Sequence, residues 1–139
     1  MTNRLFEKIF DFFFKTKEYI FYSLKAKDEY SVHSPLVFDF YTTAVKNSKL
    51  SLKEKIHNHF SSFAIEDCNS FSLINSKLQE ESDNIIIIIE NIHSNIRNHK
   101  QWKRLCELDD VFTSIDFFSL GLIIKSSKLI KRQHYILWK

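Results

Sequence analysis

The chain has 139 residues, enough for one domain, and 44% of them are apolar, which excludes disorder throughout. Its formal net charge of +3, without any long basic run, favours solvated helix faces over a nucleic-acid interface. Two cysteines, Cys68 and Cys106, are too few for a disulfide framework, so we expect a reducing, cytoplasmic setting.

Residues 3–25 are predicted to form one amphipathic helix. Its large apolar side chains recur on one face at Leu5, Ile9, Phe13, Ile20 and Leu24. Charged residues interrupt the apolar run, so neither a signal peptide nor a spanning helix is expected. Such a helix can lie on an anionic membrane surface, but we expect its apolar face to pack on the protein's own domain instead.

Two further helix starts can be identified in the first half of the chain. In Ser34-Pro35 the hydroxyl can cap a first turn and proline suits the first helical position, so a helix is predicted to about Lys46. Ser51–Glu54 fits a capping box and predicts a third helix over 52–62. Residues 64–70 are compatible with more than one structure.

The pattern changes to strands in the second half. Residues 71–81 have weak helical spacing, and Ile85–Ile89 form an unbroken β-branched run, typical of a strand buried on both faces. Helical spacing returns over 95–108. Strand-like segments follow at Val111–Phe117, Leu120–Lys125 and His134–Trp138. Gly121 is expected at a hairpin bend or bulge.

These elements predict an α/β fold. A helical region over residues 1–63 precedes a region over 64–139 with a small mixed β-α-β-β-β sheet, and together they are expected to form one compact domain.

Several motifs, taken in order, resemble a known family. The first part reads K-A-K at residues 25–27 and V-H-S-P-L-V-F-D-F at 32–40. The second reads I-I-E-N-I-H-S at 88–94, S-I-D-F-F at 114–118 and Q-H-Y-I-L at 133–137. Together they resemble the two ends of a bacterial family of class I S-adenosylmethionine-dependent methyltransferases, similar to O-methyltransferases.

The resemblance covers roughly residues 22–62 and 71–139 and implies an internally truncated member. Family members are much longer, and their middle part holds the acidic, glycine-rich loop and the acidic residue that bind S-adenosylmethionine. Here the only glycine is Gly121. The resemblance therefore implies the C-terminal half of a Rossmann-like fold, with no cofactor expected for this chain alone: a pseudoenzyme that is not catalytic by itself.

Glu90 and His93 are the candidate catalytic residues, because they follow the buried strand and sites in such sheets form beyond the carboxyl ends of strands. In the resembled family such groups could help bind a metal or accept a proton. The alternative role for Glu90 is capping of the next helix. His33 is the candidate substrate-binding residue, with loop ordering as its alternative.

No metal site is predicted from the sequence. His57 and His59 are two residues apart on a predicted helix and point away from each other, so they cannot both bind one ion with Cys68. Asp116, in a predicted strand, either pairs with a neighbouring side chain or faces water.

The strand Ile85–Ile89 would lack one neighbour if the middle of the family fold is missing. An open edge of this kind favours association. Residues 64–71 could supply a substitute strand, a second chain could pair there as a homodimer or partner, or helix 3–25 could cover it. The alternative to the methyltransferase-like function is therefore a small non-enzymatic interaction module that self-associates or binds a partner protein.

Overall fold

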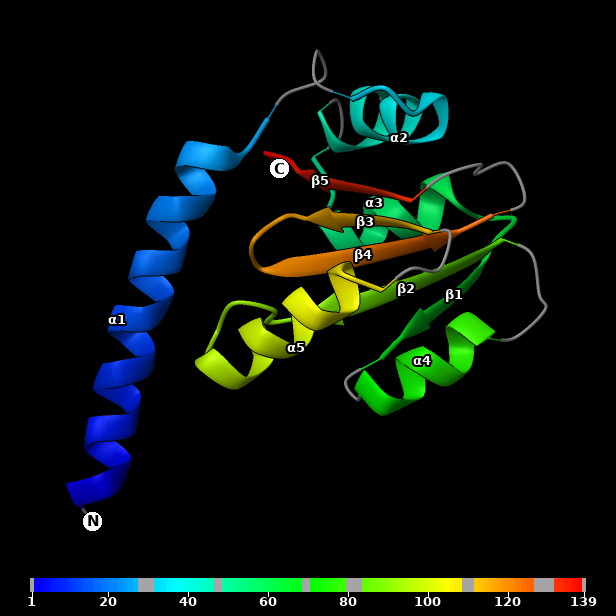
Figure 1. Ribbon diagram of the computed structural model, residues 1–139. Helices are drawn as coiled ribbons and strands as arrows, with labels where there is room; N and C mark the ends of the chain where they lie inside the picture. The colour runs from blue at the N-terminus through cyan, green and yellow to red at the C-terminus, as the bar shows by residue number, and fades with distance from the viewer. Residues whose placement is uncertain are drawn as a thin grey trace.

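The computed structural model describes residues 2–27, 32–46, 49–68, 71–79, 84–108, 112–126 and 132–138. Its α-helices are α1 (Thr2–Lys25), α2 (Pro35–Phe40), α3 (Leu52–His59), α4 (Phe71–Gln79) and α5 (Ile96–Cys106). Its strands are β1 (Ala64–Asp67), β2 (Ile85–Glu90), β3 (Thr113–Asp116), β4 (Leu120–Lys125) and β5 (Gln133–Ile136). The predicted α/β class, with helices first and a mixed sheet, is confirmed (Figure 1).

The strands form one sheet in the order β1-β2-β4-β3-β5. β4 runs antiparallel to both of its neighbours, whereas β1 pairs parallel with β2 and β3 pairs parallel with β5. β1 comes from residues 64–70, the segment whose sequence is compatible with more than one structure. It lies along β2 with Ala64 opposite Ile85. The expected open edge of Ile85–Ile89 is therefore not open, because a substitute strand covers it.

The isoleucine strand is buried on both faces, as predicted. Ile86 and Ile88 pack in the core that α2 and α3 cover, while Ile85, Ile87 and Ile89 pack in the core beneath α4 and α5. Figure 1 shows these helices on opposite faces of the sheet. The α2–α3 core joins side chains from both predicted regions of the chain.

Both predicted helix starts are confirmed by their caps. The Ser34 hydroxyl accepts a hydrogen bond from the Val37 N–H, and the Ser51 hydroxyl accepts one from the Glu54 N–H. After α2 the helix continues as a π-helical turn over Tyr41–Val45. α3 ends earlier than predicted, because Phe60 leaves the helical conformation at φ −100° and ψ 41°.

Gly121 does not form the hairpin bend that the sequence predicts. It lies inside β4 opposite Ile89, and the left-handed residue of the turn is Phe118, with φ 71°. The glycine is needed for space, because a Cβ atom there would lie 2.6 Å from Cζ3 of Trp102. Trp102 on α5 packs against the sheet at this position.

α1 packs on the rest of the protein through the side opposite to the one that the sequence predicts. The predicted apolar-face residues, from Leu5 to Leu24, are 43–75% exposed, so the prediction that this face packs on the protein's own domain is wrong. The helix docks instead through its other side, where Glu18 and Tyr22 contact the rest of the chain. Figure 1 shows the N-terminal part of α1, in blue, standing clear of the sheet.

Among the described residues, no helix combines the length and apolarity needed to cross a bilayer.

Candidate functional site

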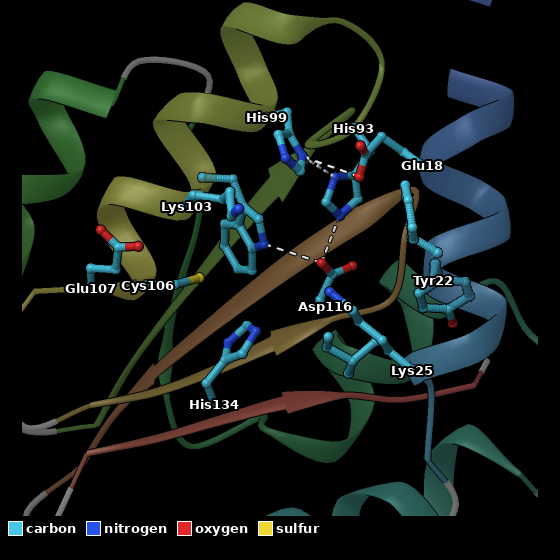
Figure 2. Close-up of a pocket in the computed structure, with 13 residues that line it drawn as sticks. Glu18, Tyr22, Lys25, His93, His99, Lys103, Cys106, Glu107, Asp116 and His134 are labelled. Atoms are coloured by element: carbon cyan, nitrogen blue, oxygen red, sulfur yellow. Dashed lines mark hydrogen bonds and ion pairs between the residues drawn. The ribbon is translucent and has the colours of Figure 1, made fainter. Parts of the chain in front are cut away.

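A cavity of about 450 Å³ lies between α1, α5 and the edge of the sheet where β3 ends. Its polar lining includes Glu18, Tyr22, His93, His99, Trp102 and Asp116. Figure 2 shows Glu18 of α1, His93 of the loop after β2, His99 of α5 and Asp116 of β3 converging on this cavity. This position agrees with the rule that sites form beyond the carboxyl ends of strands.

Asp116 is the buried centre of this cluster. Its Oδ2 atom lies 2.6 Å from Nε2 of His93 and accepts a hydrogen bond from the Trp102 indole at 3.2 Å. Its Oδ1 atom accepts from the Phe118 N–H at 2.8 Å. Of the two alternatives for Asp116, pairing with neighbours is therefore the correct one. The same carboxylate also supports the left-handed turn at Phe118 that leads into β4.

The hydrogen bond to Asp116 sets the orientation and tautomer of His93. A carboxylate only accepts, so His93 donates through Nε2, and in the neutral imidazole Nδ1 is then the nitrogen that carries the lone pair. That Nδ1 atom faces Nδ1 of His99 at 2.9 Å. The His93 ring also stacks on Phe118, with centroids 5.5 Å apart and planes 19° apart, which holds the imidazole in place.

Glu18 extends the cluster to α1. Its Oε2 atom lies 3.6 Å from Nδ1 of His99, so Asp116, His93, His99 and Glu18 form a continuous chain of polar groups. Burial lowers the pKa of His99, and the Glu18 carboxylate opposes that shift. Glu18, His93 and His99 each offer one ligand atom, and these atoms all lie within 4.8 Å of one another.

Two further groups at the cavity, the Tyr22 hydroxyl and the Cys106 thiol, stay protonated near neutral pH. Burial raises the pKa of Tyr22, and its hydroxyl donates to the carbonyl oxygen of Leu137. Burial raises the pKa of Cys106 to about 12. A thiol with such a pKa is protonated at neutral pH and is therefore not a nucleophile there.

The structure separates the predicted catalytic pair. His93 lines the cavity, whereas Glu90 does not; its half-exposed carboxylate lies 3.7 Å from Lys53 on α3. His33, the candidate substrate-binding residue, is exposed and does not line the cavity.

His57 and His59 are also apart from each other. His57 is exposed, and His59 lies 3.5 Å from Asp39. Cys68 packs in the core on the α4–α5 face, whereas His59 packs on Phe40, on the other side of the sheet.

Glu18, His99 and Trp102 were missed as site residues. His99 and Trp102 carry a weak signal, because residues three apart on a helix share one face. Glu18 carries none, because the side of α1 that meets the sheet depends on docking and not on the apolar pattern.

Comparisons with known proteins gave no match. No family model, no curated protein and no solved structure matches this chain. The methyltransferase resemblance therefore depends on the quoted motifs alone and stays a prediction.

Proposed function

We propose that the chain is a methyltransferase-related protein that does not transfer methyl groups by itself. The observation that carries the proposal is the position of its single glycine. Gly121 lies inside β4 beneath Trp102, so it is not available for a turn between a strand and a helix. A backbone cradle for a nucleotide-like cofactor depends on glycine at such a turn, because a side chain blocks the approach.

The strand arrangement supports the relationship to the resembled family. The buried strand β2 is followed by α5 and then by the β3–β4 hairpin, in the order of the quoted motifs. The residues 114–118 motif contributes Asp116, and the residues 88–94 motif contributes His93. The motif at residues 88–94 and the motif at residues 114–118 therefore meet at one buried hydrogen bond beside the cavity.

Titration of the purified chain with S-adenosylmethionine in a calorimeter tests this proposal. We expect no saturable heat up to millimolar ligand, because no glycine-rich loop is present to bind it. A circular dichroism spectrum of the same sample establishes that the protein is folded. Saturable binding would contradict the proposal and would indicate that the chain binds the methyl donor and can act as a methyltransferase.

A second candidate function is an interaction module that self-associates. It is favoured by the outward face of α1, which exposes Leu5, Phe6, Ile9, Phe10, Phe12, Phe13, Tyr19, Ile20, Phe21 and Leu24. An exposed set of large apolar side chains on one side of a helix favours an interaction site. A partner at the edge of Ile85–Ile89 would have to displace β1, so the outward face of α1 is the better docking surface.

A second copy of the chain fits this face better than a membrane. At about 100° per residue, the exposed apolar positions cover slightly more than half of the helix circumference. A flat bilayer surface covers at most about half of a helix, whereas packing against a second copy can cover more.

Sedimentation velocity over a range of concentrations tests the second candidate. We expect a concentration-dependent dimer for the native chain and a monomer for the double variant Ile9→Glu with Phe13→Glu. Lys15→Glu, on the other side of α1, is the matched control and should still dimerise. A native monomer at high concentration contradicts self-association, and co-sedimentation with anionic liposomes would assign the face to a membrane instead.

A further inference from the structure

Three metal-ligating side chains meet where α1 docks on the body of the protein. Glu18 comes from α1, His93 from the loop after β2, and His99 from α5. The His93 and His99 Nδ1 atoms are 2.9 Å apart, and Glu18 Oε2 is 3.6 Å from the His99 nitrogen. Among the described residues, this is the group that could hold a metal ion.

The cluster has the supporting contact that metal-binding histidines usually have. A ligating histidine commonly donates its other ring N–H to a carboxylate, which fixes the ring and its tautomer. Asp116 does this for His93 at 2.6 Å, and Asp116 is itself held by Trp102 and Phe118. The lone pair of His93 Nδ1 is therefore directed at the place where the other two ligand atoms converge.

We propose that Glu18, His93 and His99 bind one divalent transition-metal ion of the zinc class. Two imidazole nitrogens with one carboxylate are a zinc ligand set, whereas calcium and magnesium prefer oxygen. With bonds of about 2.0–2.1 Å, ligand atoms on a tetrahedron lie about 3.3 Å apart. The distance of 2.9 Å between the two histidine Nδ1 atoms is shorter than this value, and the distance of 3.6 Å from His99 Nδ1 to Glu18 Oε2 is longer.

Three protein ligands leave the fourth tetrahedral position open. All three residues line the cavity of about 450 Å³, so a water molecule or a small ligand in that cavity can take the open position. Because Glu18 belongs to α1 and the histidines belong to the body of the fold, the bound ion also links the helix to the body. This inference does not depend on whether S-adenosylmethionine binds.

Calorimetric titration of the full, chelator-treated chain with Zn²⁺ alone tests the site. We expect one equivalent to bind, and we expect Co²⁺ to give the visible absorption of a tetrahedral site. His99→Gln and Glu18→Gln should each weaken binding at least tenfold. Asp116→Asn should weaken it about 10–100-fold, the usual loss when a supporting contact of a metal ligand is removed.

Two matched variants control for unspecific binding. His57→Gln removes an exposed histidine, and Glu7→Gln removes an exposed carboxylate from the same helix as Glu18, so both should bind Zn²⁺ like the native chain. Circular dichroism establishes that each variant is folded. The proposal is overturned if the native chain shows no saturable Zn²⁺ binding, or if His99→Gln and Glu18→Gln bind as it does; the cluster is then a hydrogen-bonded chain only.

Discussion

Replacing Asp116 with alanine is expected to lower the free energy of unfolding by about 3–5 kcal/mol. The buried carboxylate accepts hydrogen bonds from His93, Trp102 and the Phe118 N–H, and its loss leaves all three donors without this acceptor. Each buried donor left unsatisfied costs about 1–3 kcal/mol. Urea denaturation followed by tryptophan fluorescence and circular dichroism measures the loss.

Asp67→Ala is the matched control for this prediction. Both aspartates end a strand, but Asp67 is about half exposed and forms an ion pair with Lys53 at 2.9 Å. Its removal should cost about 0–1 kcal/mol, as for other exposed pairs. Asp116→Asn keeps an acceptor oxygen and should fall between the two. Equal stabilities for the two alanine variants would show that Asp116 does not hold the cluster together.

Gly121→Ala is expected to destabilise the protein by about 1–3 kcal/mol, the usual cost of overpacking a core. The added Cβ atom would lie 2.6 Å and 2.7 Å from two ring atoms of Trp102 and 3.1 Å from Cγ2 of Ile92. Trp102 is almost fully buried and its indole is bonded to Asp116, so the ring cannot move aside freely. Chemical denaturation of the variant measures the effect.

A double-mutant cycle with Trp102→Phe identifies the cause of that loss. Phenylalanine lacks the part of the indole that the new methyl group meets, so Gly121→Ala should cost less in the Trp102→Phe background. The same cost in both backgrounds would assign the effect to the backbone of β4 and not to the contact with Trp102.

The sequence predicted those helices and strands whose formation depends on residues close together in the chain. Ser34 and Ser51 cap helices through their own hydroxyl groups, and the run Ile85–Ile89 needs no partner to indicate a buried strand. β1 could not be predicted in this way, because Ala64–Asp67 is a short, partly exposed segment whose pairing with β2 defines it.

The candidate site was predictable only in part for the same reason. His93 follows a buried strand, and that position alone made it a candidate. Its partners come from α1, α5 and β3, and their meeting depends on how those elements pack. The apolar pattern of α1 even indicated the wrong side of the helix, because the residues that dock it, Glu18 and Tyr22, lie outside that pattern.

The end of α1 is held by residues that are synthesised more than a hundred positions later. Lys27 donates to the Ile136 carbonyl, the Trp138 N–H donates to the Lys27 carbonyl, and Tyr22 donates to the Leu137 carbonyl. At about 5–20 residues per second, translation of the intervening chain takes on the order of 10 s. For that interval the nascent chain carries an amphipathic helix without these contacts. These contacts can therefore form only after β5 has been synthesised, so the end of α1 is fixed in place after every strand of the sheet has been made.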